Sequence, residues 1–434
     1  MRFLGVTETC DLGAVYLRLA AAGHEVKVFI GDEKARGTLQ GLVPRSDDWR
    51  RDLDWVRAVG AEGVILFEAV SEGFGALQDS LRGDGFQVIG GSAFGDRLEN
   101  DRAYAQALLE SLGLQTAATR EFTDAREAEA FIAARPRRYV LKFSGPDHAS
   151  HDNYVGHSAD GSDVRAMLRL RGEGAGAARF VLMDHVEGIE MGVGAYFNGE
   201  NFLTPACLDW EHKRFFAGDM GELTGEMGTV ATFARSEAFF ERTLARVAPM
   251  LREHGHVGYV NLNTIVNRDG IWPLEFTCRF GYPGFAILDP LQQTSWADLF
   301  ALMLSRRSAR FAARAGFSVG VVMTTPPFPY SRKEVDAPVG LPVLLPGSFT
   351  PEDLANIHYG EVGLEGSQLV TSGLYGWSMV VTGTGPTIAA AQRAAYGRAG
   401  QILIPNVRYR LDIGERLIAS DYAALEAMSI FSAA

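Results

Sequence analysis

The sequence predicts a multidomain protein of the α/β and α+β classes, with a parallel sheet at the N-terminus, a mixed middle region and a β-rich end. Three observations predict this organisation. Strand-like and helix-like segments alternate over roughly the first hundred residues, a hairpin joins two apolar runs in the second half, and turns rich in Pro and Gly separate the last strands. A chain of 434 residues has room for about three domains.

The N-terminal region follows the pattern of βαβ units. We expect strands over residues 2–6, 24–30, 63–67 and 86–90, and a first helix over residues 12–22. Gly23 stands where that helix should stop, directly before the second strand. A further helix over 104–112 ends at Gly113. We therefore place the first domain boundary near residue 118.

We expect the first domain to cover residues 1–118 and two further domains to cover residues 119–315 and 316–434. In the middle region, strands over 139–143 and 180–185 enclose a polar loop at 144–154 of the type that often faces a ligand. Apolar runs at 259–266 and 271–276 flank Asn267-Arg268-Asp269-Gly270, a typical hairpin turn. The last region combines strands such as 378–382 with one helix over 387–400.

Composition narrows the class of protein. With 41 basic and 53 acidic residues the net charge is −12, which argues against a protein that binds nucleic acid through its phosphates. The longest apolar stretches, such as 317–323, are shorter than the roughly 20 residues that cross a bilayer, and no export signal is visible. Cys10, Cys207 and Cys278 match no disulfide or zinc spacing. We expect a soluble cytoplasmic protein with small-molecule partners and no nucleic acid or membrane partner, and we leave a homodimer open.

Lys142 is the first residue that carries chemistry, because it lies inside the apolar strand Y-V-L-K-F. An ammonium group in such a strand is costly to bury unless an anion meets it. The alternative is an edge-strand lysine that faces water. Farther along, the strand F-V-L-M-D-H-V leads to Glu190, whose carboxylate can accept hydrogen bonds from ribose hydroxyls.

The hairpin carries a candidate metal site. Asn263 lies on its first strand, and Glu275 and Thr277 share one face of the second. Oxygen ligands of this kind suit Mg²⁺, which completes its coordination with water and substrate phosphates. The alternative is a solvated hairpin face. The first strand-to-helix turn, Gly5–Gly13, is neither GxGxxG nor a Walker A sequence.

Taken in order, these features resemble the ATP-grasp superfamily and, more narrowly, the phosphoribosylamine–glycine ligase (glycinamide ribonucleotide synthetase) family, over nearly the whole chain. The resemblance is carried by residues 98–102 (L-E-N-D-R), 209–228 (D-W-E-H-K-R-F-F-A-G-D-M-G-E-L-T-G-E-M-G), 274–283 (L-E-F-T-C-R-F-G-Y-P) and 409–414 (Y-R-L-D-I-G). It implies an N-terminal α/β (pre-ATP-grasp) domain, an ATP-grasp domain of two subdomains and a small β-rich C-terminal domain. It also implies ATP and Mg²⁺, with Mn²⁺ as an alternative ion.

The resemblance assigns roles to single positions. Nucleotide binding falls to Arg102, at a position that is usually lysine, and to Lys142, Asp184, Val186 and Glu190. Glu275 matches the main metal ligand, and Asn263 and Thr277 are the further oxygen donors that we expect. Lys213, Arg214 and Arg279, which we expect to act in catalysis, border the acyl-phosphate and amine site together with Asp219. The alternative for each is a charged loop residue that is paired internally.

Departures from the family pattern concern the substrates. Thr277 stands where the family has asparagine, and the glycine-rich loop that covers ATP is replaced by S-G-P-D-H-A-S-H-D-N-Y, which leaves open whether this loop closes on ATP. The N-terminal turn that helps to hold phosphoribosylamine is replaced by V-T-E-T-C-D-L-G, with Glu8 and Asp11. Glu226 adds another carboxylate near the acceptor site. These changes favour a neutral or cationic amine over a phosphorylated one.

The sequence therefore predicts an ADP-forming carboxylate–amine ligase that works through an acyl phosphate, activating an amino acid and joining it to an amine other than phosphoribosylamine. One alternative is a phosphoribosylamine–glycine ligase of purine biosynthesis with a diverged turn. An alternative of another class is a nucleotide-binding protein that has lost catalysis.

Overall fold

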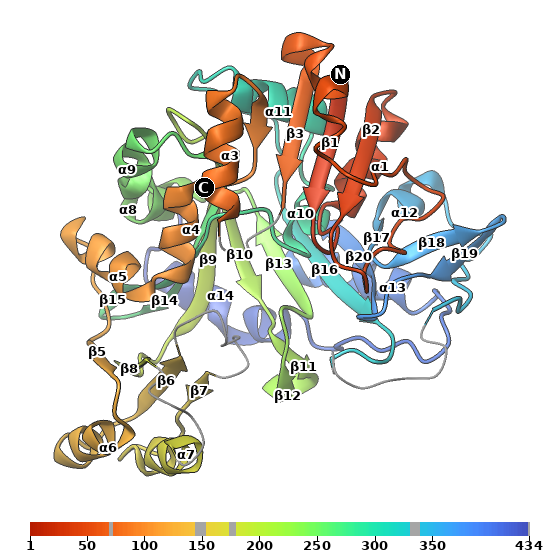
Figure 1. The fold of residues 1–434 in the computed structure, drawn as a ribbon. Coiled ribbons are helices and arrows are strands. Elements are labelled where there is room, and N and C mark those ends of the chain that lie inside the picture. Colours follow the sequence, from red (N-terminus) through yellow and green to blue (C-terminus); the bar gives the residue numbers. More distant parts are fainter. Residues whose placement is uncertain (69–72, 144–152, 173–178, 330–338, 433–434) are drawn as a thin grey trace. The chain divides into compact units, whose positions relative to one another are not determined.

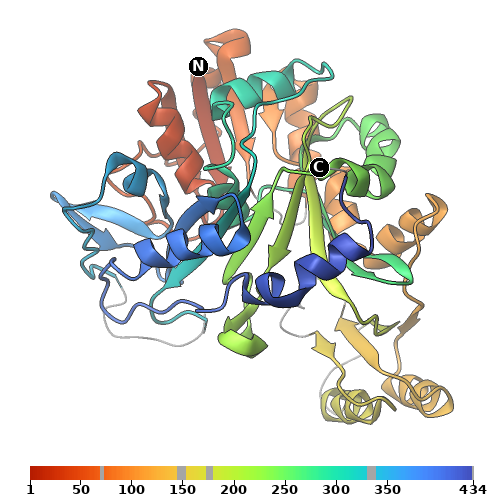
Figure 2. The ribbon, with the colours of Figure 1, turned by 180° about the vertical axis from the view of Figure 1, so that it is seen from behind.

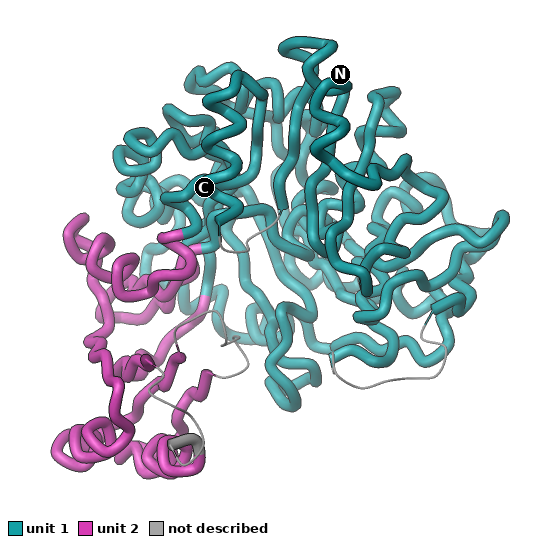
Figure 3. Tube along the Cα trace, viewed as in Figure 1, with its two compact units in different colours: residues 1–96, 191–262, 277–434 teal, residues 97–190, 263–276 magenta. Residues whose placement is uncertain are grey.

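The chain divides into two compact units (Figure 3). Unit 1 comprises residues 1–96, 191–262 and 277–434, and unit 2 comprises residues 97–190 and 263–276. The computed structural model describes residues 1–68, 73–143, 153–172, 179–329 and 339–432. Most of the loop expected at 144–154 therefore lies outside the described residues. The three-domain division at residues 118 and 315 stays a prediction.

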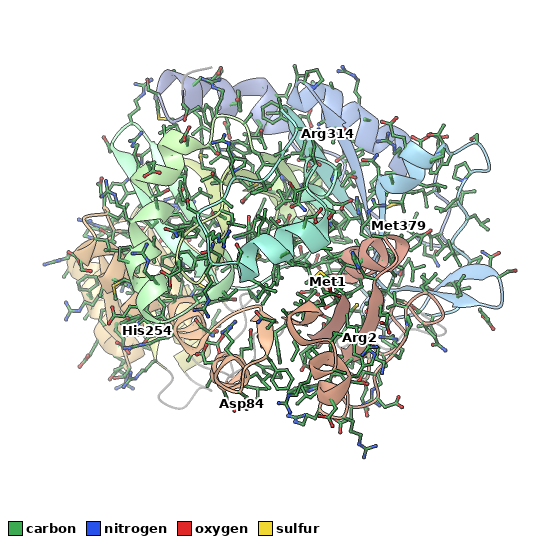
Figure 4. The ribbon with its side chains drawn as sticks, turned by 90° about the horizontal axis from the view of Figure 1, so that it is seen from above. Met1, Arg2, Asp84, His254, Arg314 and Met379 are labelled. Carbon is green, nitrogen blue, oxygen red and sulfur yellow. The ribbon has the colours of Figure 1, made fainter. Side chains whose placement is uncertain are left out.

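Unit 1 begins with a parallel sheet in the order β2-β1-β3-β4, the arrangement that the alternating pattern predicts (Figure 1). The strands are β1 (Arg2–Thr7), β2 (Glu25–Ile30), β3 (Gly63–Phe67) and β4 (Gln87–Ile89). The helices of this region are α1 (Gly13–Ala21), α2 (Leu53–Arg57), α3 (Phe74–Gly83) and α4 (Ala93–Asn100). Arg2, labelled in Figure 4, ties β1 to β2 through an ion pair of 3.0 Å with Glu25. Residues of β1 are almost completely buried, because helices cover both faces of a parallel sheet.

A larger antiparallel sheet fills the rest of unit 1. Within this unit its strands follow the order β14-β9-β10-β13-β16-β20-β17. They are β9 (Ile189–Asn198), β10 (Cys207–Glu211), β13 (Gly228–Thr232), β14 (Val257–Asn267), β16 (Phe317–Thr324), β17 (Ile357–Tyr359) and β20 (Trp377–Gly385). Two hairpins stand apart from it, β11 (Arg214–Phe216) with β12 (Met220–Leu223), and β18 (Val362–Glu365) with β19 (Gln368–Thr371).

Helices cover both faces of this sheet. Gly320 on β16 leaves room for Ile287, and Gly383 on β20 leaves room for the backbone of Ala391 and Ala395. Gly320 pairs with Thr382, the neighbour of Gly383, so the two glycines face opposite sides of the sheet. α10 (Gly284–Leu288) therefore packs on one face and α13 (Ile388–Ala399) on the other, where Figure 2 shows it. The remaining α-helices of unit 1 are α8 (Glu237–Arg242), α9 (Ala248–Glu253), α11 (Trp296–Leu304), α12 (Pro351–Ala355) and α14 (Tyr422–Ala427).

The expectation of one helix in the C-terminal region is wrong, since α12 and α14 accompany α13. The signal for α12 was readable. Thr350 accepts a hydrogen bond from the Asp353 backbone N–H, the Asp353 side chain accepts one from the Thr350 N–H, and Pro351 occupies the first helical position. Thr-Pro-Glu-Asp is thus a capping box at the start of a short helix.

Unit 2 is small and has its own core. Its sheet follows the order β5-β8-β6-β7 and packs against α6 and α7 through residues such as Phe122, Ile132, Leu141 and Leu168. Its elements are α5 (Arg102–Ser111), β5 (Thr119–Phe122), α6 (Ala125–Ala134), β6 (Tyr139–Phe143), β7 (Tyr154–Val155), α7 (Ser162–Gly172), β8 (Phe180–Asp184) and β15 (Gly270–Thr277), of which Thr277 belongs to unit 1. The predicted turn between β14 and β15 is confirmed, because Asn267 Oδ1 accepts the backbone N–H groups of Asp269 and Gly270.

No described helix is both long enough and apolar enough to cross a membrane.

Candidate functional site

Lys142 lies on an inner strand of the unit 2 sheet. β6 has β8 on one side and β7 on the other, and Lys142 pairs in register with Val181 of β8. β6 is therefore not an edge strand, and the Lys142 side chain is half-buried. An ammonium group in this position suits an anionic ligand, because partial burial strengthens its interaction with a negative charge.

Glu190 and Asn263, predicted separately as ribose and metal ligands, contact each other. Asn263 Nδ2 donates to Glu190 Oε1 at 2.6 Å, and Asn263 Oδ1 accepts the backbone N–H of Thr264 at 3.0 Å. Asn263 is buried, whereas Glu190 is exposed at the start of β9. Asn263 thus orients the Glu190 carboxylate, and its own oxygen is engaged with the backbone.

Arg102 and Glu275 form an ion pair, with 2.6 Å between Arg102 Nη1 and Glu275 Oε2. Two hydrogen bonds fix the elements that carry them. The Asp101 side chain caps α5 by accepting from the Tyr104 N–H, and Gln106 Nε2 donates to the Leu274 carbonyl on β15 at 3.0 Å. Because both charged groups are only partly buried, each remains within reach of a ligand.

The fit to Mg²⁺ rests on Glu275. Within the described residues there is no group of three or more His, Cys, Asp and Glu side chains that could hold a metal ion. Mg²⁺ commonly takes only one or two carboxylates and fills its other positions with water and substrate phosphates, so one carboxylate suffices. Phe276 is buried between the half-buried Glu275 and Thr277, as the expected alternation along β15 requires. Asn263 is the member of the predicted set whose oxygen has another partner.

Asp184 and Val186 lie at the end of β8 and just after it. The Asp184 carboxylate forms an ion pair of 2.5 Å with Arg137, and its backbone N–H donates to the Ala118 carbonyl. The role of these two residues in adenine recognition stays a prediction.

In unit 1, the N-terminal turn is built around a buried carboxylate that the sequence did not single out. Glu68 directly follows β3 and is 3% exposed. Its Oε2 accepts the Leu12 N–H at 2.9 Å, and the Tyr16 hydroxyl donates to its Oε1. Burial and the nearby charge of Asp11 raise the pKa of Glu68 to about 8. The start of α1 therefore already holds a carboxyl group of the chain itself.

Asp11 and Arg279 come together beside this turn. The Asp11 carboxylate accepts hydrogen bonds from the Thr9 hydroxyl at 2.8 Å and from the Tyr282 backbone N–H. Burial raises the pKa of Asp11, and the positive charge of Arg279 opposes that shift. Arg279, predicted as catalytic, thus lies near a predicted substrate ligand.

Glu8 has a different environment from Asp11. Its side chain is exposed, and partial burial and the charge of Asp32 raise its pKa. Asp32 in turn accepts a hydrogen bond of 2.5 Å from the Tyr375 hydroxyl. Glu8 is therefore part of an acidic edge formed with Asp32.

A second group of carboxylates surrounds Lys213, which is predicted as catalytic. Lys213 Nζ lies 3.1 Å from Glu211 Oε2, and Asp209 Oδ2 accepts from Asn261 Nδ2 at 2.7 Å. Glu226 is 7% exposed, and its Oε1 has no hydrogen-bond partner among the described residues. Burial, and then the charges of Glu211 and Asp209, raise the pKa of Glu226 well above its usual value.

Arg214 and Asp219 belong to a network that holds the β11–β12 hairpin. Arg410 is 3% exposed, pairs with Asp219 at 2.8 Å and with Asp412 at 2.5 Å, and donates to the Arg214 carbonyl. Arg214 Nη1 donates to the Gly221 carbonyl within the hairpin. Both residues therefore have structural contacts, and their roles toward substrate stay predictions.

Sequence reasoning missed Glu68, Tyr282 and Glu361. Glu68 had a readable signal, because a carboxylate that directly follows a fully buried parallel strand lies at the edge where such sheets bind ligands. Tyr282 lay inside a quoted family segment without a role. Glu361 accepts the N–H groups of Tyr375, Gly376 and Trp377, partners that no local pattern discloses.

Comparison with known proteins shows which family this chain is similar to. Residues 100–285 match the family model "Phosphoribosylglycinamide synthetase, ATP-grasp (A) domain". A phosphoribosylamine–glycine ligase of Listeria monocytogenes is 26% identical over 416 residues, covering 93% of this chain and 96% of that protein. Another from Ralstonia nicotianae is 28% identical over 359 residues, covering 79% and 81%.

Solved structures show the same fold. The phosphoribosylamine–glycine ligase of Thermotoga maritima superposes with a TM-score of 0.72 and 22% identity, covering 95% of this chain and 100% of that one. The biotin carboxylase domain of the 2-oxoglutarate carboxylase of Hydrogenobacter thermophilus, solved with MgADP and bicarbonate, gives a TM-score of 0.65 with 13% identity, covering 100% and 99%. The fold class is thereby confirmed.

Members of this family are ligases that form carbon–nitrogen bonds and use ATP and Mg²⁺. The order of motifs along the chain, the match of the middle region and the fold agree. Residues 100–285 are therefore similar to the ATP-grasp domain of the phosphoribosylamine–glycine ligase family, and nearly the whole chain resembles members of that family in sequence and in fold.

Proposed function

We propose that this ATP-grasp ligase activates an amino acid as an acyl phosphate, releases ADP and joins the acyl group to an amine other than phosphoribosylamine. The observation that carries the choice of amine is the Glu68 carboxyl group at the start of α1. Backbone N–H groups at a helix N-terminus are a common seat for a phosphate. Here Glu68 accepts the Leu12 N–H and the Cys10 carbonyl accepts the Gly13 N–H, so two of the N–H groups at this turn are not available to a phosphate.

The surroundings of Glu68 support the same preference. Asp11 adds a carboxylate at this turn, and the helix carries no basic residue in its first turn, since its sequence begins G-A-V-Y. A phosphate would have to displace a 3% exposed carboxyl group and approach Asp11. An uncharged or positively charged amine meets neither obstacle.

The chemistry follows from the properties of a carboxylate. An amine does not displace oxide from a carboxylate at a useful rate, so the γ-phosphoryl group must first be transferred to the carboxylate oxygen. The amine nitrogen then forms the C–N bond while the C–O bond to phosphate breaks. Mg²⁺, when bound, neutralises negative charge on the phosphates.

The chain's own residues position the reactants. We infer that Lys142 and Arg102 contact the nucleotide phosphates, that Glu190, oriented by Asn263, accepts from the ribose, and that Glu275 holds the metal. Arg102 and Glu275 pair with each other. When a nucleotide and its metal ion bind, this pair would have to separate. The Arg102 guanidinium would then bind a phosphate, and the Glu275 carboxylate would bind the ion.

The test measures ADP release from ATP and Mg²⁺ with amino acids crossed against amines. Ethanolamine and O-phosphoethanolamine form a matched pair that differs in the phosphate alone, and phosphoribosylamine with glycine is included. We expect turnover with unphosphorylated amines only. Efficient turnover of phosphoribosylamine with glycine would establish the purine-pathway ligase instead. Tight ATP binding without ADP release for any pair would establish a nucleotide-binding protein that has lost catalysis, which the Thr277 substitution favours.

A further inference from the structure

The Tyr282 hydroxyl in unit 1 is a buried polar group whose hydrogen-bonding capacity is unused among the described residues. Its ring stacks on Trp377, with 4.7 Å between ring centroids and 19° between planes, which fixes the direction of the hydroxyl. Burial raises the pKa of Tyr282 well above its usual value, and the charges of Asp11, Glu361 and Glu226 add to the shift. The hydroxyl therefore lies in surroundings of negative charge from three separate segments.

Glu226 is the second buried group with an unused oxygen. Its side chain is 7% exposed, and Oε1 has no partner in the part of the chain that the structure describes. The preceding Gly225 lies against Trp377, because a Cβ at that position would come within 3.2 Å of the indole ring. Trp377 thus packs against both the segment of Glu226 and the ring of Tyr282.

The other carboxylates around this pair have partners. Glu361 accepts the backbone N–H groups of Tyr375, Gly376 and Trp377 at 3.2, 2.6 and 3.0 Å. Asp11 accepts from the Thr9 hydroxyl and lies near Arg279. Their hydrogen bonds hold these two carboxyl groups in place. Burial raises the pKa of Asp11 and raises that of Glu361 to about 7, so the negative potential that they contribute grows as pH rises.

The positive charge that acts on Glu226 belongs to Lys213, which is already paired with Glu211. The charge of Lys213 opposes the rise of the Glu226 pKa, yet its ammonium group lies 3.1 Å from Glu211, and Asp209 also acts on Glu226. Glu226 therefore lies near two further carboxylates and near one lysine that is already paired. A ligand that donates hydrogen bonds and carries a positive charge would satisfy the carboxylate and the hydroxyl, whereas an anion would be repelled.

We propose that Glu226 and Tyr282 bind a positively charged ammonium group of the amine substrate, which places that substrate in the class of cationic, unphosphorylated amines. Glu226 supplies the charge-assisted hydrogen bond, and the Tyr282 hydroxyl accepts a second N–H. Asp11 and Glu361 contribute to the negative potential without direct contact. The proposal rests on the proposed function for the identity of the ligand as a substrate, but the site itself can be tested without ATP.

The test is calorimetric titration of the full chain, without ATP, with 1,4-diaminobutane, 4-aminobutan-1-ol and 1,4-butanediol, which have the same length and fall in charge. We expect the wild type to bind both amines, the diamine more tightly, and not the diol. Glu226→Gln should weaken amine binding about tenfold or more, and Tyr282→Phe by a smaller factor. Glu365→Gln, at an exposed carboxylate on β18, is the matched control and should bind like the wild type.

The outcomes separate the site from the proposed function. Equal binding of diamine and diol, unchanged amine binding in Glu226→Gln, or no amine binding by the wild type would overturn the proposal. Tyr282→Phe provides the same test should Glu226→Gln not fold. Loss of amine binding in Glu226→Gln together with the absence of ADP release for every substrate pair would support the site while refuting the proposed function.

Discussion

Replacing Glu68 with glutamine tests the central feature of the N-terminal turn, a buried carboxyl group that fills the start of α1. Its pKa is about 8 in the folded chain against a usual 4.5, through burial and the charge of Asp11. The folded chain therefore keeps the Glu68 proton to a higher pH than the unfolded chain does. The stability that this contributes is complete below about pH 4.5 and is lost as pH rises toward 8.

The magnitude follows from the two pKa values. Between about pH 5 and about pH 8.5, this one group should cost the wild type about 4 kcal/mol of unfolding free energy. Glutamine has nearly the same shape, keeps an oxygen for the Leu12 N–H and cannot ionise. Glu68→Gln should therefore be close to the wild type at about pH 5 and more stable than it at about pH 8.5, by an amount of this order.

The assay is urea unfolding of wild type and Glu68→Gln across this pH range, followed by tryptophan fluorescence, with Glu365→Gln as the exposed control. Groups that titrate alike in wild type and variant contribute equally to both unfolding free energies, so their contributions cancel in the difference. A difference that stays flat from about pH 5 to about pH 8.5 would show that Glu68 is ionised in the fold. The account of a proton-bearing carboxyl group at the start of α1 would then fail.

Three further predictions concern the nucleotide site and the fold. Glu275→Gln should abolish ADP formation and leave the circular dichroism spectrum unchanged, and normal turnover would remove the metal assignment. Lys142→Met should raise the KM for ATP about tenfold to a hundredfold, because a charge-assisted hydrogen bond to phosphate is lost, and an unchanged KM would contradict its placement. Thr350→Ala should cost about 1 kcal/mol of unfolding free energy through loss of the α12 cap, while leaving ADP release per folded molecule unaltered.

Local patterns predicted those parts of the fold whose stabilising contacts are local. The β1–α1–β2 unit follows from its periodicity, and the β14–β15 turn follows from Asn267, whose side chain bonds N–H groups two and three residues on. The order of the strands in the antiparallel sheet could not be predicted from the sequence, because β16 pairs with β13 and β20, which are far from it along the chain. Such pairings depend on packing between segments, on which no single window reports.

The candidate site divides in the same way. Lys142, Glu190 and Glu275 could be found from strand patterns and family motifs, since each lies on or next to a strand with a recognisable sequence. The contacts between them could not, because nothing local indicates that Asn263 turns its amide toward Glu190 or that Arg102 pairs with Glu275. Tyr282 escaped notice because its importance comes from Asp11, Glu226 and Glu361, which approach it from other segments.

Three carboxylates depart from the family pattern and look alike in the sequence: Glu8, Asp11 and Glu226. Each of them would repel a phosphate group 4 Å away by about 1 kcal/mol at the screening typical of a protein surface. Their environments differ in the structure. Glu8 is exposed beside Asp32, Asp11 is partly compensated by Arg279, and Glu226 is buried with an unused oxygen. Under the proposed function, rejection of phosphate would depend mainly on Glu68 at the start of α1, and attraction of a cation on Glu226. Variants at these two positions should therefore alter amine choice in different ways, the first relaxing the exclusion of phosphate and the second weakening amine binding, with ATP affinity unchanged in both.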